Sequence, residues 1–167
     1  MATIAELLDE LSQEADTTRR VLERVPEDKL GWKPHDKSMT MGQLALHIAV
    51  VPGAIAELAT RSQFDISTPV PRPQPESVAQ ILSALQQSIT TAKAALHSLS
   101  DSSLADPWKM TAGTREVFAI SRGALIRNVL LNHWYHHRGQ LTVYLRQTDA
   151  LVPSVYGPSA DENPFGG

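Results

Sequence analysis

The feature that most constrains this chain is a helical hydrophobic repeat that returns four times. Apolar residues recur at three- and four-residue steps over 4–25, 44–58, 78–99 and 121–147. This spacing places them on one face of an α-helix. Pro26 ends the first repeat, and the alternating prolines of 63–76 exclude a helix there. Four amphipathic helices bury their apolar faces best against one another, which predicts a four-helix bundle.

Local signals indicate where these helices begin and bend. The segments 40–43 and 77–80 each fit a capping box, in which a hydroxyl and an amide side chain satisfy each other's backbone N–H groups. Ser121 is the expected start of the fourth helix. Within the second helix, Pro52 should cause a kink, because proline lacks the N–H that would bond the carbonyl of Ile48.

The links between the helices determine the predicted topology. The proline-rich link 63–76 is extended and can reach along the bundle, so we predict a crossover connection rather than a simple up-down arrangement. Residues 104–118 lack the helical spacing of apolar residues and contain a Thr-Ala-Gly turn between two short segments with apolar residues. This pattern predicts a short hairpin or an irregular link between the third and fourth helices. The prediction is an all-α chain that forms one domain over 1–167.

Composition excludes several classes of protein. Fifteen Lys and Arg face 18 Asp and Glu, for a net charge of −3, so no basic excess is available to neutralise nucleic-acid phosphates. The chain has no cysteine, which excludes disulfides, zinc–thiolate sites and a cysteine nucleophile. It has no uninterrupted apolar run of about 18 residues, and its acidic, amphipathic start does not fit a signal peptide. We therefore expect a cytoplasmic protein that binds neither nucleic acid nor a membrane.

Three of the six histidines fall within residues 133–137. His133 and His137 lie one helical turn apart and only about 40° apart around the helix, so both rings can reach one point. Both interrupt an apolar stripe, where bare polar rings are costly and a metal ion would give each nitrogen a partner. His47 interrupts the stripe of the second helix and is the natural third ligand. Three imidazoles would leave a coordination position for water or substrate, as catalytic sites do.

Plainer explanations exist for each histidine. A lone core histidine such as His47 is more often a hydrogen-bonded core residue than a ligand. His35 belongs to a loop, His97 to a surface or a helix end, and His136, about 100° from its neighbour at 137, to a facing helix or the rim of the site. Trp134 stands where a zinc protease of the HExxH type has its glutamate, and the paired Glu-x-x-His elements of di-iron bundles are absent.

Other residues near the pair can be placed by helical geometry. Gln140 and Tyr144 lie within about 60° of the two histidines, so they could orient water or substrate, or simply form hydrogen bonds in the core. These two are the candidate catalytic residues. Arg138 points away from the ligands and favours an interhelical or dimer salt bridge. Trp32 and Trp134 favour core packing over a role as substrate walls.

Four segments resemble the DinB/YfiT-like family: 131–146, which contains the HHRGQ element, 26–34 followed by 41–47, and the tail 152–162. The resemblance covers nearly the whole chain. It implies a four-helix bundle with a crossover, usually dimeric, that binds nickel or zinc through three histidines. Carried over position by position, these ligands are His47, His133 and His137.

The family resemblance also limits the expected function. Some relatives are S-transferases or isomerases that depend on a low-molecular-weight thiol, and others are described as metal-dependent hydrolases. We expect a metal-dependent homodimeric enzyme of one of these types, acting on a small molecule, in which the ion lowers the pKa of a bound water to around 7 or deprotonates a thiol. The absence of cysteine fits a thiol supplied by a cosubstrate. The first alternative to an enzyme is a non-catalytic metal-binding bundle with a stress-related or interaction role. The second alternative is a DNA-binding protein.

Overall fold

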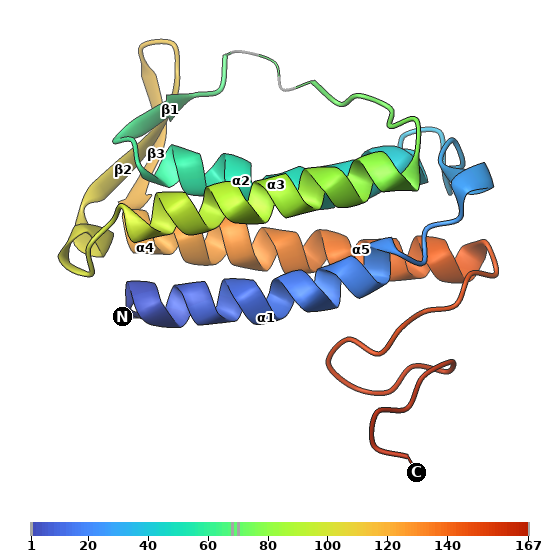
Figure 1. The fold of residues 1–167 in the computed structure, drawn as a ribbon. Coiled ribbons are helices and arrows are strands. Elements are labelled where there is room, and N and C mark those ends of the chain that lie inside the picture. Colours follow the sequence, from blue (N-terminus) through green and yellow to red (C-terminus); the bar gives the residue numbers. More distant parts are fainter. Residues whose placement is uncertain (1, 68, 70, 167) are drawn as a thin grey trace.

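The computed structural model describes residues 2–67, 69 and 71–166, and four helical rods lie side by side in it (Figure 1). The rods are α1 (Ile4–Leu22), α2 (Met41–Ala59), α3 (Val78–His97) and a fourth made of α4 (Arg122–Leu125), a π-helical segment (Ile126–Asn132) and α5 (His133–Gln147). Short 3-10 helices cover Glu27–Lys29 and Ser102–Ala105. Rods α1 and α4–α5 run one way along the bundle, and α2 and α3 run the other way.

The helices begin where side chains cap them. At α2, the Thr40 hydroxyl accepts the Gln43 N–H while the Gln43 side chain accepts the Thr40 N–H, so this predicted capping box is present. At α3, the Ser77 hydroxyl accepts the Gln80 N–H, but the Gln80 side chain accepts instead from Glu76. The second half of that predicted box is therefore wrong, because a competing N–H one residue earlier takes the amide oxygen.

The prediction of an all-α chain is wrong, because a three-stranded sheet covers one end of the bundle (Figure 1). Its order is β1 (Gln63–Asp65), β2 (Pro107–Ala112) and β3 (Arg115–Ser121). Strand β2 pairs antiparallel with β3 and parallel with β1. A strand of three residues has no hydrophobic period to detect, and β1 forms because its backbone groups find partners on β2.

Strands β2 and β3 form the hairpin that was one of the two alternatives for the link before the fourth helix. Ala112 pairs with Arg115, so Gly113 and Thr114 alone make the turn. Gly113 has a φ of 60°, which a residue without a Cβ adopts at little cost. The indole of Trp108, fully buried on β2, donates to the carbonyl of Leu58 at 3.0 Å and ties the hairpin to α2.

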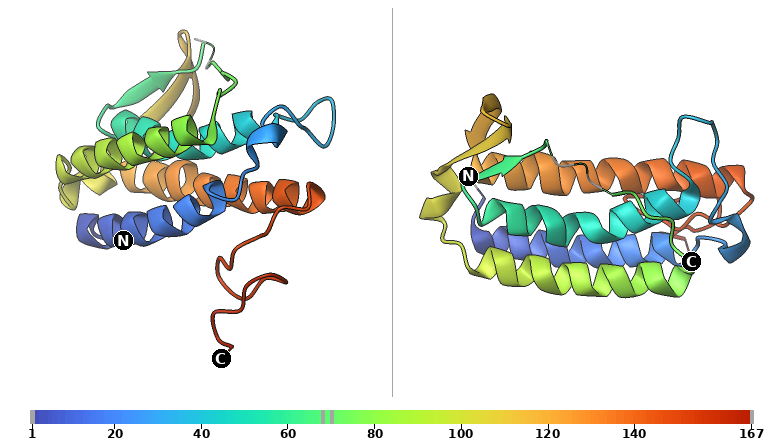
Figure 2. Two further views of the ribbon diagram at one scale, coloured as in Figure 1. Left: turned by 45° about the vertical axis from the view of Figure 1, so that its right-hand side comes forward. Right: turned by 90° about the horizontal axis from the view of Figure 1, so that it is seen from above.

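After β1 the chain crosses the length of the bundle to reach α3 (Figures 1 and 2). The far end of this crossover is fixed to the start of α2. Gln74 donates to the carbonyl of Leu30 at 3.0 Å and accepts from the Thr40 hydroxyl at 2.6 Å. A Cβ on Gly42 would lie 2.6 Å from the Gln74 amide nitrogen. The missing side chain at Gly42 therefore lets the crossover lie directly against α2.

The centre of the bundle is built around α2. Pro52 lies inside this helix, and the carbonyl of Ile48 accepts instead from the indole of fully buried Trp134 at 2.9 Å. The Ile48 carbonyl, which Pro52 leaves without its helical partner, therefore accepts a hydrogen bond from a side chain of α5. By length and composition alone, α2 is the one described helix that could cross a membrane, and 61% of the stretch that passes this test is buried inside the protein.

Arg138 joins α5 to α1 and to the C-terminal tail. Its side chain is 1% exposed, forms an ion pair with Glu14 and donates to the hydroxyls of Thr18 and Tyr156. The ring of Tyr156 lies 5.0 Å from the guanidinium carbon, as in a cation–π contact. Of the two salt bridges expected for Arg138, the interhelical one is present.

Candidate metal centre

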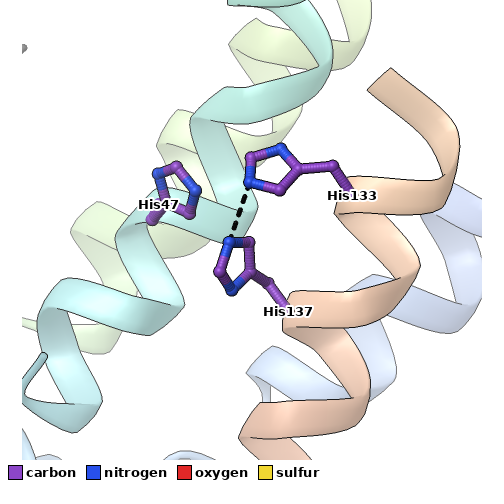
Figure 3. Close-up of side chains that lie close together, drawn as sticks. All are labelled: His47, His133 and His137. Atoms are coloured by element: carbon purple, nitrogen blue, oxygen red, sulfur yellow. Dashed lines mark hydrogen bonds between the residues drawn. The ribbon is translucent and has the colours of Figure 1, made fainter. Parts of the chain in front are cut away.

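Three histidines from two helices converge at the predicted site. His47 lies on α2, and His133 and His137 lie one turn apart on α5. Figure 3 shows the three rings directed toward one another. One nitrogen from each ring lies within 4.8 Å of the other two, and the Nε2 atoms of His133 and His137 are 2.8 Å apart. No other His, Asp or Glu joins this group among the described residues.

The segment before His133 is π-helical over Ile126–Asn132. A π-helix closes hydrogen bonds over five residues rather than four, so it rotates the next helix relative to a continuous α-helical path. This rotation helps to set which face of α5 points at α2. The sequence contains no signal for it, because π-helical turns arise from packing rather than from a residue preference.

Gln140 touches one of the predicted ligands. Its side-chain oxygen lies 3.0 Å from Nδ1 of His137. An amide oxygen only accepts, so Nδ1 carries the proton and Nε2 keeps a lone pair directed at the centre. Tyr144 lies farther away, with its hydroxyl 3.5 Å from both the Gln140 amide nitrogen and the carbonyl of Met39. Gln140 therefore orients the His137 ring, whereas Tyr144 makes only a long contact with Gln140.

Burial keeps the three rings neutral. It lowers the pKa of His47 to about 4, with further lowering by the charges of His137 and His133. Burial is also the main cause that lowers the pKa of His133 and of His137. At neutral pH all three imidazoles are therefore neutral, and a metal ion would replace the proton that the Nε2 atoms of His133 and His137 share in their 2.8 Å hydrogen bond. Nδ1 of His133 is buried and has no hydrogen bond of good geometry in the described part of the chain, and the backbone of Val129, one turn earlier, interacts with this ring and opposes the lowering of its pKa.

These residues fit a divalent metal ion. Neutral imidazoles are good ligands for zinc, nickel and copper. Around a tetrahedral zinc with bonds of about 2.0–2.1 Å, ligand atoms stand about 3.3 Å apart. The 2.8 Å pair on α5 and the 4.8 Å outer limit of the group bracket this value, so small side-chain rotations suffice. Three protein ligands leave a position open, as in catalytic rather than structural sites.

The remaining histidines lie outside this group. His35 is in a loop and accepts from the backbone of Lys37. His97 is the last residue of α3, is exposed, and lies against the carbonyl of Lys93. His136 is exposed at the rim of the site, with its ring 5.0 Å from that of the neighbouring ligand on α5. These positions agree with the loop, helix-end and rim placements expected from the sequence.

One residue at the site was missed by sequence reasoning. The carbonyl of Arg72, in the crossover, accepts from Gln43 at 3.1 Å. The charge of Arg72 contributes to lowering the pKa of both His47 and His137. No sequence spacing relates Arg72 to the histidines, because only the folded crossover brings it to them.

Comparison with known families matches residues 1–164 to the DinB family. The chain belongs to this family. Among curated proteins, the uncharacterized protein YrdA of Bacillus subtilis (strain 168) is 27% identical in an alignment of 169 residues, and the match covers 96% of this chain and 92% of YrdA. The family assignment therefore agrees with the resemblance seen in the histidine segments.

Solved structures of DinB-like proteins share the fold. One from Bacillus cereus ATCC 10987 superposes with a TM-score of 0.71 at 24% identity and covers 92% of this chain and 98% of its own. YjoA of Bacillus subtilis superposes with a TM-score of 0.66 at 17% identity over 87% of this chain and 94% of its own. At these identities the similarity concerns the arrangement of helices and strands.

Proposed function

We propose that this DinB protein binds one divalent ion, nickel or zinc, through His47, His133 and His137, and acts as a metal-dependent enzyme on a small molecule. The observation that carries the proposal is the convergence of three neutral imidazole nitrogens within 4.8 Å, with no fourth ligand among the described side chains. A closed structural site would require that fourth ligand.

The proposed reaction type rests on two features: an open coordination position on the ion and the absence of cysteine from the chain. When bound, the ion would supply a Lewis acid that lowers the pKa of a water or thiol at the open position. The chain has no cysteine, so a sulfur nucleophile has to come from a cosubstrate. Both facts fit thiol-dependent S-transfer or hydrolysis. Gln140 would hold the His137 ring with Nε2 directed at the ion.

Metal content tests the ligand set. The wild type should hold close to one zinc or nickel ion per chain when purified protein is measured by elemental mass spectrometry. His133→Ala and His47→Ala should lose this content, because two imidazoles bind far more weakly than three. His97→Ala, which removes an exposed histidine at the end of α3, is the matched control and should retain it. Equal metal content in all four proteins would refute the proposed site.

Activity tests the enzymatic part of the proposal. Metal-loaded protein should transfer a low-molecular-weight thiol to an electrophile, or hydrolyse an ester or amide, and chelation should abolish the reaction. A protein that holds the ion but is inert to every such substrate would favour the non-catalytic metal-binding bundle.

The proposal extends to the setting of the protein. We propose a cytoplasmic homodimer with a small-molecule substrate and no nucleic-acid partner. Zero cysteines fit a reducing compartment, a net charge of −3 opposes phosphate binding, and the family resemblance supports the dimer. Light scattering after gel filtration should give twice the mass of the 18.3 kDa chain, and a mass of one chain would contradict the dimer.

A further inference from the structure

One permanent cation, Arg72, lies near the three histidines, and no carboxylate among the described residues contacts them. The Arg72 backbone is held beside α2 by the Gln43 side chain at 3.1 Å, and the Arg72 charge reaches His47 and His137, whose pKa values it helps to lower. In the part of the chain that the structure describes, none of the three rings forms an ion pair or hydrogen bond with an Asp or Glu. Ligating histidines commonly donate to a carboxylate, which offsets the charge of the metal.

The partners identified behind the histidines are neutral: the Gln140 amide for His137 and the Val129 backbone for His133. Gln140 holds His137 through an amide oxygen, which orients the ring without adding negative charge. A divalent ion bound by neutral imidazoles would therefore keep its full positive charge. In a half-buried site, that charge is only partly screened by water.

Arg72 adds a further positive charge at the same place. Gln43, which holds the Arg72 carbonyl, precedes His47 by four residues on α2. This is slightly more than one helical turn, or about 6 Å along the axis, well within reach of an arginine side chain. Arg72 is exposed and forms no ion pair with any described residue, so its guanidinium is available to a ligand.

The backbone near Arg72 is held in place. Gln74, two residues later, is bonded to the carbonyl of Leu30 and to the hydroxyl of Thr40. A Cβ on Gly42 would come within 3.0 Å of the Pro75 ring as well as colliding with Gln74. The crossover therefore lies against α2 through several contacts, which position Arg72 beside the site rather than free in solvent.

These observations deepen the proposed function and rest on it. We infer that the substrate or cosubstrate of this site is an anion, a small molecule with a carboxylate or sulfonate group that pairs with the Arg72 guanidinium while its reacting atom lies at the open position beside the three histidines. Arginine suits this role because its planar fork matches the oxygens of such groups. An anion would also neutralise the uncompensated charge of the ion.

A pair of thiols with matched carbon chains tests the inference. Cobalt(II)-loaded protein would be titrated with 2-mercaptoethanesulfonate, which is anionic, and with 2-mercaptoethanol, which is neutral, and binding followed by the cobalt–thiolate absorption. The wild type should bind the anionic thiol about tenfold more tightly, because one charge-assisted contact is worth about that factor. Arg72→Gln should lose this preference while binding the neutral thiol as before.

Two variants sharpen the result. Arg115→Gln removes the same charge at the tip of the hairpin and should keep the preference of the wild type. Gly42→Ala should displace the crossover and reduce the preference while Arg72 is intact, with the melting temperature measured to show that the protein is folded. An equal preference in wild type and Arg72→Gln, or an equal loss in Arg115→Gln, would overturn the inference.

Metal content separates this inference from the proposed function. Arg72→Gln should hold as much cobalt as the wild type, because Arg72 is not a ligand. A wild type that binds no metal would refute the proposed function itself. A wild type that binds cobalt and both thiols equally would refute only the assignment of an anionic substrate.

Discussion

Trp134 ties together the two helices that carry the three histidines, because its hydrogen bond joins residues adjacent to His133 and His47. It directly follows His133, and the carbonyl it bonds belongs to Ile48, which directly follows His47. That carbonyl is free because Pro52 has no N–H to offer it. One hydrogen bond between fully buried groups therefore fixes α2 and α5 at the level where their histidines meet.

Replacing this indole should weaken both the fold and the site. Trp134→Phe leaves the Ile48 carbonyl buried without a partner, which should cost about 1–3 kcal/mol in the free energy of unfolding. It should also lower metal affinity by about tenfold, as the loss of an outer-shell contact does. Urea unfolding and calorimetric zinc titration measure the two effects.

Trp108→Phe is the matched control for this prediction. Trp108 is equally buried and also donates to a carbonyl of α2, that of Leu58, but at the hairpin end of the helix. It should lose stability and keep its zinc affinity. If both variants bind zinc equally well, Trp134 does not position the ligands.

A second residue-scale prediction concerns Asp149, which follows α5 with a φ of 57°. The N–H of Ala150 bonds the Leu145 carbonyl and that of Asp149 approaches the Arg146 carbonyl, the pattern of a Schellman cap. Glycine adopts this conformation without strain, and aspartate also places a negative charge at the negative end of the helix. Asp149→Gly should therefore raise stability by about 0.5–1 kcal/mol, as measured by urea unfolding. Asp149→Ala, which keeps the strain, should gain less, and a destabilised glycine variant would contradict the argument.

At the scale of elements, α1 is held to the fourth rod beside the π-helical segment. The Glu10 carboxylate accepts two hydrogen bonds from Arg127 at 2.7 Å and one from the Tyr135 hydroxyl at 2.8 Å. The Arg127 contact is the main cause that lowers the pKa of Glu10, with Tyr135 adding to it. The pairing thus favours the ionised carboxylate in the folded protein.

This contact makes stability depend on pH in the acid range. A carboxyl whose pKa is lower in the folded state stabilises the protein above its unfolded pKa of about 4.5, and that contribution disappears as pH falls through the folded value. Glu10→Gln should cost about 0.5–1 kcal/mol at pH 7, since the pair is partly exposed, and progressively less below pH 4.5. Urea midpoints from about pH 7 to 3 measure it. Asp9→Asn, an exposed neighbour on α1, should change little, and a constant Glu10→Gln cost at all pH values would contradict the assignment.

The elements that could be predicted from sequence are those fixed by local contacts. The Thr40–Gln43 capping box and the helical spacing of the histidines on α5 involve residues three or four apart, so the sequence shows them directly. Strand β1 depends on pairing with Lys109 to Thr111, far along the chain, and the π-helical segment depends on packing between rods. Neither leaves a local pattern. The all-α prediction was wrong because β1 joins the hairpin in a three-stranded sheet, and this pairing could not be read from the sequence.

At the scale of the whole molecule, the site combines local and distant information. Helical geometry alone pairs His133 with His137, whereas His47 could be added only from its place in a buried stripe and from the family resemblance. Arg72 could not be found in either way, because a cation in a proline-rich link has no periodic relation to a bundle core. The Arg72 charge comes close to the histidines only when the crossover between α2 and α3 is folded against the bundle.

The three-histidine group that we propose as a metal site spans α2 and α5, so metal binding there should stabilise the whole molecule. An ion that binds only the folded state adds about 2.7 kcal/mol at a hundredfold excess over its dissociation constant. For a domain of this size that corresponds to a rise of about 5–10 °C in melting temperature. Scanning calorimetry of chelator-treated protein, with and without added zinc or nickel, measures the shift. His47→Ala should show almost none, and His35→Ala, which alters only a loop histidine, should match the wild type. A shift that survives in His47→Ala would mean that the stabilising ion binds somewhere other than between α2 and α5.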